Sequence, residues 1–246
     1  MDYWNNITAL AAQMPTRPVT AQLTALTAWR QAVAASRLPN LPLPRLGLTG
    51  EAMAEAEYAF GVPAKAVRDL DHLLRNYRQY IAYHYGMWAF VQTALFTSWT
   101  ELFGRQRYLE VAAGNGYVSA GLQAAGNPVI TTDSLTWRPQ NETGRHPLVP
   151  VRQAGASAAL WQYGEAVDAV VMAWSPDHEW SDAAFLQLLR RRFSNLPLFV
   201  IGERAGATDS RLFWQLAQFV PDRRLLTLNR QFPRFDAIND RIYLIK

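Results

Sequence analysis

The sequence predicts an α/β fold: a three-layer sandwich around a mostly parallel seven-strand sheet with a C-terminal antiparallel hairpin, preceded by an N-terminal helical region. Three observations predict it. Residues 1–104 consist of helix-forming stretches separated by prolines, residues 105–246 alternate apolar β-rich runs with helical patterns, and one polar loop separates the last two runs. We therefore expect a helical region over 1–104 and a sheet domain over 105–246.

The N-terminal region is expected to be helical because of its composition and its capping residues. The stretch Val19–Ser36 is rich in alanine and leucine, which have high helix propensity. The proline-rich segment 38–44 favours an extended connector laid over the surface. Thr49 is expected to cap the next helix, and Pro63 to open the one after it.

Seven apolar, β-rich runs predict the strands of the sheet. They are Tyr108–Ala112, Val129–Thr132, Leu148–Val151, Ala169–Ala173, Leu198–Ile201, Leu225–Leu228 and Ile242–Ile245. Helical patterns over 119–125, 155–163 and 182–193 separate the first five runs, and another over 209–219 precedes the sixth. Helical crossovers make strands parallel, whereas the short loop 231–241 makes the last two antiparallel.

Composition and charge limit the function classes. The 246 residues are 50% hydrophobic and 18% charged, which suits a sizeable buried core. The net charge of +4 is dispersed, and its tightest cluster, Arg190–Arg192, is typical of a solvated helix end, so we expect no nucleic-acid partner. The most apolar stretch, Met87–Phe103, is interrupted by polar residues, and the first residues lack a signal-peptide pattern. We therefore expect a cytoplasmic protein without a membrane partner; nothing indicates its oligomeric state.

The most informative segment is a turn between the first predicted strand and the helix after it. Glu110 ends the strand, Gly114 and Gly116 allow a close backbone approach, and Asp133 ends the next strand. This order is typical of a nucleoside site, in which the second acid binds ribose hydroxyls. Gly114, Gly116 and Ser119 approach a dinucleotide fingerprint, but an acid at position 110 would repel a pyrophosphate. The acid favours a ligand with a cationic group.

The segment Glu110-Val-Ala-Ala-Gly-Asn-Gly-Tyr117 resembles the first motif of class I, Rossmann-like S-adenosylmethionine-dependent methyltransferases, Glu/Asp-x-Gly-x-Gly-x-Gly. The resemblance is closest to poorly characterised bacterial methyltransferase-like proteins. It extends to Ala173-Trp-Ser-Pro176 after the fourth strand and Ile201-Gly-Glu203 after the fifth. Two departures are Ala112, where the motif has its first glycine, and Gln153, where an acid is common.

The resemblance implies S-adenosylmethionine as the cofactor and a role for each matching residue. Glu110 would orient the amino group of the methionine moiety, and Asp133 would accept from the ribose hydroxyls. The remaining implied cofactor-binding residues are the turn residues Ala112, Gly114, Asn115 and Gly116, then Gln153 and Ala154 beside adenine, and Trp174 at the methionine end.

Candidates for the substrate cleft come from two segments. Ser175 and Pro176 follow the fourth strand, where open α/β sheets present reacting groups, although a plain strand-ending turn is the alternative. The aromatic stretch before the first strand offers a second wall of the cleft, or else a helix that only packs on the sheet. Its candidate cleft residues are Tyr80, Tyr83, Tyr85 and Trp88.

Three residues are candidates for a general base: Asp177, His178 and Glu203, of which His178 suits neutral pH. The acids are not spaced to favour a metal, and none is expected. We therefore expect an S-adenosylmethionine-dependent methyltransferase that acts on an unidentified small molecule. Two alternatives stay open: a catalytically inactive methyltransferase-fold protein acting as a binding module, favoured by Ala112 and Gln153, and an NAD-dependent oxidoreductase.

Overall fold

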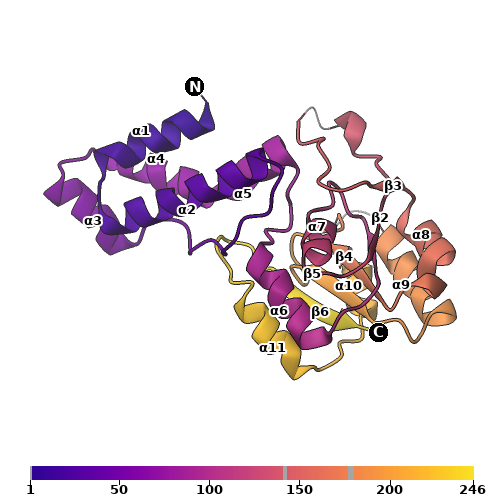
Figure 1. Cartoon of the computed structure of the whole chain (residues 1–246). Coiled ribbons are helices and arrows are strands. Elements are labelled where there is room, and N and C mark those ends of the chain that lie inside the picture. Colours follow the sequence, from indigo (N-terminus) through magenta and orange to yellow (C-terminus); the bar gives the residue numbers. More distant parts are fainter. Residues whose placement is uncertain (1, 141–142, 177–179) are drawn as a thin grey trace.

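The computed structural model describes residues 2–140, 143–176 and 180–246, and it begins with a group of helices (Figure 1). The helices before the sheet are α1 (Tyr3–Gln13), α2 (Arg17–Ala34), α3 (Gly50–Ala59), α4 (Ala64–Arg75), α5 (Tyr77–Tyr85) and α6 (Thr93–Phe103). As predicted, Thr49 caps α3 by accepting from Ala52 N, and Pro63 immediately precedes α4. The segment 38–44 forms no helix or strand. The helical N-terminal half is thus confirmed.

The rest of the chain builds a mostly parallel sheet with helices between its strands, as predicted. The strands are β1 (Tyr108–Val111), β2 (Val129–Asp133), β3 (Arg152–Gln153), β4 (Ala169–Ala173), β5 (Leu198–Gly202) and β6 (Arg241–Ile245). The helices are α7 (Tyr117–Ala124), α8 (Ala156–Tyr163), α9 (Ser181–Arg192), α10 (Arg211–Leu216) and α11 (Arg223–Arg230), with short 3-10 turns at Arg138–Gln140 and Gly164–Ala166. Strand order is β3-β2-β1-β4-β5-β6, and only the β5–β6 pair is antiparallel.

Two predicted strands differ in the structure, and the described residues form six strands, not seven. The run Leu225–Leu228 lies inside α11, because Asp222 caps a helix there by accepting from Arg224 N. The run Leu148–Val151 ends just before β3. Asn229, in α11, replaces part of the missing strand: its side chain donates to Ile242 O and accepts from Ile242 N, both at 2.9 Å. The exposed edge of β6 is thereby partly closed.

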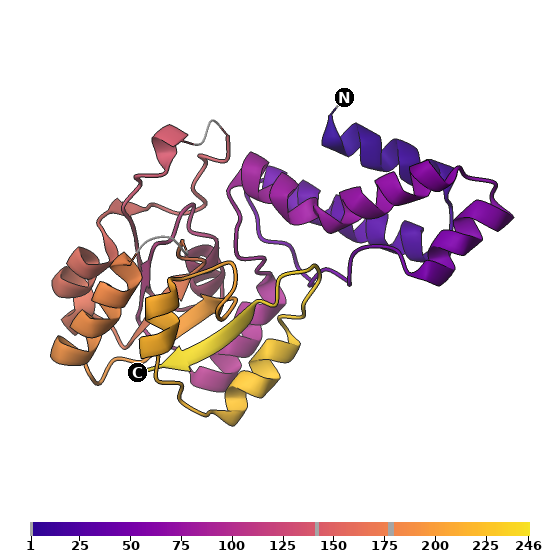
Figure 2. The ribbon, with the colours of Figure 1, turned by 180° about the vertical axis from the view of Figure 1, so that it is seen from behind.

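The two faces of the sheet bury separate hydrophobic clusters. Val171, Phe199 and Ile201 face the cluster that contains α6, α7 and α11 side chains. Val170 and Val200 face the other, with α8, α9 and α10. This alternation follows from the two-residue period of a strand, and it places helices on both faces, as predicted. Figure 2 shows the same layers from behind.

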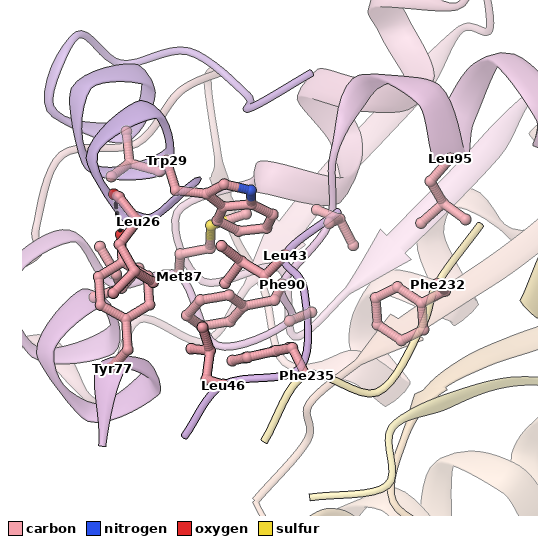
Figure 3. Packing of buried hydrophobic residues seen from close by; sticks show 14 of the residues in the cluster. Leu26, Trp29, Leu43, Leu46, Tyr77, Met87, Phe90, Leu95, Phe232 and Phe235 are labelled. Atoms are coloured by element: carbon pink, nitrogen blue, oxygen red, sulfur yellow. Dashed lines mark hydrogen bonds between the residues drawn. The ribbon is translucent and has the colours of Figure 1, made fainter. Parts of the chain in front are cut away.

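A continuous hydrophobic cluster joins the N-terminal helices to the sheet (Figure 3). The Phe90 ring lies 5.2 Å from Trp29 of α2 and 4.6 Å from Phe235, which precedes β6. Leu46 N also donates to Phe235 O at 2.7 Å. Within the described residues, no helix combines the length and apolar character needed to cross a membrane.

Candidate functional site

The site predicted from the sequence lies at the carboxyl ends of the parallel strands. The chain leaves β1 toward β2 on one side, while β4 and β5 lie on the other. The order of strands therefore reverses between β1 and β4, and α/β folds form their ligand crevices at this point. The predicted cofactor and cleft residues come from the ends of β1 to β4, from α5 and from the segment that follows α5.

The turn after β1 contains three residues with left-handed backbone. Ala112, Gly114 and Gly116 have φ angles of +52°, +56° and +73°. At Gly114 an added Cβ would meet no atom within 4 Å, whereas at Gly116 it would lie 2.6 Å from Val149 Cγ2. The motif's first glycine is thus replaced by an alanine in a conformation that disfavours every side chain.

Glu110 lies beneath this turn and not at its surface. Its side chain is 1% exposed, and its Oε2 accepts from Ser119 N at 2.7 Å and from the Ser119 hydroxyl. Burial raises the pKa of the Glu110 carboxyl to about 8, although the Ser119 donors oppose the shift. The acid therefore occupies the N-terminus of α7, where a pyrophosphate would otherwise bind.

Asp133, at the end of β2, holds the turn from the other side. Its Oδ2 accepts from Gly114 N at 2.7 Å, and its Oδ1 accepts from Leu135 N at 2.6 Å and Trp137 Nε1 at 3.0 Å. The carboxylate is 5% exposed. Since each carboxylate oxygen has two lone pairs, Oδ2 keeps room for another donor beside Gly114.

Asn115 connects the turn to two other segments. Its Nδ2 donates to Tyr85 O at 3.1 Å, at the end of α5, and to Gly144 O; its backbone oxygen accepts from Leu148 N at 2.8 Å. Residues 143–149 belong to the connection between β2 and β3, and they lie across the turn that follows β1. We call these residues the strap. The Oδ1 atom of Asn115 is buried and has no hydrogen-bond partner in the part of the chain that the structure describes. This oxygen is a hydrogen-bond acceptor available to a ligand bound at the turn after β1.

On the β3 side, the predicted adenine neighbours are closer to solvent. Gln153 is exposed, and its Nε2 donates to Ser134 O at 3.4 Å. Ala154 is half-buried, and its N donates to Asp133 O at 2.9 Å. The structure thus brings both residues next to Asp133.

On the β4–β5 side, two loops are joined by backbone contacts. Pro176 forms a β-bridge with Thr208, and Asp209 N donates to Ser175 O at 2.8 Å. Glu203, a candidate base, accepts from Asn239 N and Ala207 N at 2.8 and 3.0 Å. Both of its carboxylate oxygens therefore anchor loops. The other two candidate bases, Asp177 and His178, lie outside the described residues.

Asp209 is one of the acids whose spacing in the sequence does not favour a metal, and the sequence indicated no other role for it. It has a φ of +54° and is 2% exposed, and among the described residues neither carboxyl oxygen has a hydrogen-bond partner. Burial raises the pKa of the Asp209 carboxyl to about 8, with a smaller contribution from Asp182. The sequence predicts only a helix over 209–219, and this prediction does not indicate a buried carboxyl at its first residue.

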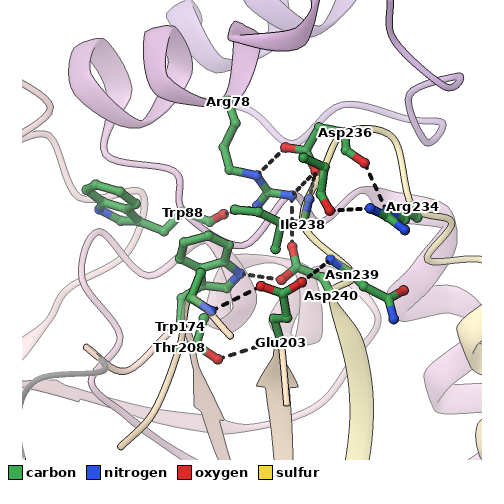
Figure 4. A network of polar contacts seen from close by, with 12 residues as sticks. Arg78, Trp88, Trp174, Glu203, Thr208, Arg234, Asp236, Ile238, Asn239 and Asp240 are labelled. Atoms are coloured by element: carbon green, nitrogen blue, oxygen red, sulfur yellow. Dashed lines mark hydrogen bonds and ion pairs between the residues drawn. The ribbon is translucent and has the colours of Figure 1, made fainter. Parts of the chain in front are cut away.

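A buried ion-pair network fixes Trp174 at the end of β4 (Figure 4). Arg78 of α5 contacts Asp236 at 2.6 Å and Asp240 at 2.9 Å, and its Nη1 donates to Trp88 O at 2.9 Å. Trp174 Nε1 donates to Asp240 Oδ1 at 3.1 Å, and the Arg78 guanidinium lies 4.7 Å from the Trp174 ring centre. Sequence reasoning missed this network because its members are up to 162 positions apart.

The four aromatic cleft candidates occupy different surroundings. Tyr80 is 7% exposed, stacks on Tyr3 at 4.5 Å and accepts from Arg30 Nε at 2.9 Å, so it lies in the helical core. Tyr83 and Trp88 are 52% and 50% exposed. Tyr85 is half-buried, and its backbone oxygen also accepts from Tyr117 Oη at 2.9 Å. The structure therefore brings the backbone of Tyr85 to the turn after β1, while its ring lies near Tyr80, and it places the Trp88 ring on Trp174 after β4.

Comparisons with known proteins give structural similarities without sequence matches. No family model matches the chain, and no curated protein matches it. A cyclopropane-fatty-acyl-phospholipid synthase-like protein from Lactobacillus casei matches 65% of this chain at 17% identity and a TM-score of 0.30, and the match spans about half (54%) of that protein. The S-adenosylmethionine-dependent methyltransferase SibL matches 99% of this chain and 73% of its own at 13% identity and a TM-score of 0.37. Human N-acetylserotonin methyltransferase, in complex with SAM, matches 95% and 68% at 13% identity and a TM-score of 0.36.

Proposed function

We propose that this chain binds S-adenosylmethionine in the crevice between β1 and β4 and transfers its methyl group to a small molecule. The observation that carries the proposal is the pairing of Asp133 Oδ2 with Gly114 N, at 2.7 Å. It holds an acid beside an open glycine turn at the reversal of strand order, where a ribose can meet both. Because the solved structures compared above have low similarity to this chain, the proposal rests on this geometry alone.

The residues present fit the cofactor's groups. Asp133 supplies an acceptor for ribose hydroxyls, and Gly114 leaves open space above the backbone. The unpaired Asn115 Oδ1 suits the ammonium group of the methionine moiety, which needs acceptors. Glu110 would act indirectly by holding Ser119 and the turn. The bound cofactor would supply an electrophilic methyl group; this chain's residues would align the acceptor with it and exclude water.

The structure also bears on the two alternative functions. Glu110 fills the N-terminus of α7, which disfavours the pyrophosphate of NAD. A catalytically inactive, methyltransferase-fold binding protein is a second candidate. It is favoured by the strap, since Val149 lies against Gly116 and leaves no room above that residue. Cofactor binding decides between this candidate and the enzyme.

Calorimetric titration with S-adenosylmethionine tests the proposal. We expect saturable binding by the wild-type chain and binding at least tenfold weaker for Asp133→Asn, because one carboxylate oxygen becomes a donor. Asp168→Asn is the matched control: Asp168 pairs with Arg107 outside the crevice and is largely exposed. Circular dichroism checks that each variant is folded. Absence of wild-type binding at millimolar cofactor, or equal binding by Asp133→Asn, would refute the proposal.

A further inference from the structure

We propose that the outer face of Trp88 is a stacking site for a planar aromatic ring, and that this ring belongs to the methyl acceptor. The second half of the statement rests on the proposed function, whereas the ring site itself does not. The inference comes from a stack of three side chains, in which the Arg78 guanidinium and the Trp88 ring both lie against the Trp174 ring (Figure 4).

The stack is held in place before any ligand binds. The Trp88 and Trp174 ring centres are 6.0 Å apart with an interplanar angle of 29°. Asp240 accepts from Trp174 Nε1 at 3.1 Å, and Arg78 donates to Trp88 O at 2.9 Å. Trp174 has a φ of +54°, a conformation that tryptophan adopts only when its surroundings impose it. A rigid aromatic surface loses little conformational entropy on binding.

The position of the stack is the crevice itself. Residues 85–88 begin over the turn after β1, where Tyr85 O accepts from Asn115 Nδ2, and end at Trp88, whose ring lies on Trp174 after β4. Gly86 permits this path, because a Cβ there would lie 2.3 Å from Asn115 Nδ2. The segment therefore crosses the point where the order of strands reverses.

The free face belongs to Trp88. Trp174 is contacted by both Arg78 and Trp88, while Trp88 is 50% exposed and, in the part of the chain that the structure describes, stacks only on Trp174. An exposed indole face offers a large apolar area and favours offset stacking with another ring.

Among the described residues, the charged groups of the stack favour a neutral ring over a cation. The carboxylates of the stack, Asp236 and Asp240, are buried against Arg78, on the side of Trp174 away from Trp88. No carboxylate of the stack is thus placed to pair with a ligand cation at the outer face. Planarity and apolar area are the properties that the stack can recognise.

The experiment compares naphthol with its saturated counterpart, decahydronaphthol, by saturation-transfer NMR and fluorescence titration. We expect wild-type protein to bind naphthol at least tenfold more tightly than decahydronaphthol. Trp88→Ala should weaken naphthol binding about tenfold, and Trp88→Phe less. Trp161→Ala is the control, since Trp161 is a 65% exposed indole on α8. Arg78→Lys should weaken naphthol binding and reduce the near-ultraviolet circular dichroism of the paired indoles, because lysine cannot hold both contacts.

The outcomes separate the ring site from the proposed function. Equal binding of the two compounds, no saturable naphthol binding, or an unchanged affinity in Trp88→Ala would overturn the ring site. Each titration is repeated with S-adenosylhomocysteine. If naphthol binds through Trp88 but the nucleoside does not bind at all, the methyltransferase proposal fails and the ring site stands. If S-adenosylhomocysteine binds and naphthol does not, the ring site fails and the methyltransferase proposal stands.

Discussion

The acidic side chains on the two sides of the crevice differ in their hydrogen bonding. On the β1–β2 side, Glu110 and Asp133 accept from the backbone and side chains around the turn. On the β4–β5 side, Asp209 is buried and both of its carboxyl oxygens lack a partner within residues 2–140, 143–176 and 180–246. Trp174 and Asp209 have left-handed backbone. The first side has a fixed shape because its two carboxyls are hydrogen-bonded around the turn, although Ala112 there also has left-handed backbone. The second side adds a buried carboxyl that has no hydrogen-bond partner among the described residues. Such features concentrate where proteins bind or transform ligands.

The largest effect should come from the ion-pair network that fixes the second side. Arg78→Met should destabilise the protein by about 3–5 kcal/mol, because Asp236 and Asp240 would remain buried without their cation. Urea denaturation measures the change. Lys65→Met, which breaks an exposed pair, is the control and should change stability by less than about 1 kcal/mol. If Arg78→Met unfolds the chain, Arg78→Met/Asp236→Asn should recover part of the loss; equal stability of Arg78→Met and the wild type would contradict the comparison.

The fixed shape of the first side can be tested at the strap. Gly116→Ala should cost about 2–3 kcal/mol, since it combines left-handed strain with a 2.6 Å approach to Val149. Gly114→Ala has the same backbone strain and open space, so it should cost only about 1–2 kcal/mol. Thermal denaturation compares the two. Gly116→Ala/Val149→Ala should remove the clash, and the absence of any such coupling would place the strap elsewhere.

The unpaired carboxyl on the second side gives a pH-dependent prediction. The pKa of Asp209 is raised to about 8 in the folded state, so the folded protein binds more protons than the unfolded chain between its ordinary pKa and about pH 8. This group's contribution to stability therefore falls as pH rises through that window. Asp209→Asn should gain stability relative to wild type, by about 1–3 kcal/mol more at pH 8 than at pH 5.

Asp133→Asn is the counterpart on the first side. Asp133 accepts three hydrogen bonds, so its substitution should destabilise the fold by about 1–3 kcal/mol. Urea titrations at both pH values measure both variants. A pH-independent Asp209→Asn difference, or stabilisation by Asp133→Asn, would remove the contrast between the two sides.

The smallest expected effect is at the alanine that departs from the glycine motif. Ala112→Gly should stabilise the fold by about 0.5–1 kcal/mol, because relief of left-handed strain exceeds the extra entropy of an unfolded glycine. Ala113→Gly, its neighbour outside the left-handed positions, should destabilise instead. Melting temperatures of the two variants check this difference in sign.

The sequence by itself determined the α/β class, the parallel strands β1, β2, β4 and β5, and the meeting of Glu110, Gly114 and Asp133 around one turn. These follow from local period and composition: apolar runs of strand length, helical patterns between them, and glycines where the chain must turn. The position of Asp133 beside Gly114 follows from adjacent parallel strands, so it needed no knowledge of distant contacts.

Only the tertiary structure decided the rest, because it depends on contacts between distant residues. The run Leu225–Leu228 has the composition of a strand, but its cap and its packing against α6 and β6 make it a helix, and Asn229 closes the edge in its place. Glu110 could not be placed beneath the turn until Ser119 was seen to donate to it. Trp174 acquires its orientation from Arg78 and Asp240, 96 and 66 positions away. The burial of a single polar side chain and an ion pair between distant residues leave no periodic signal in a sequence.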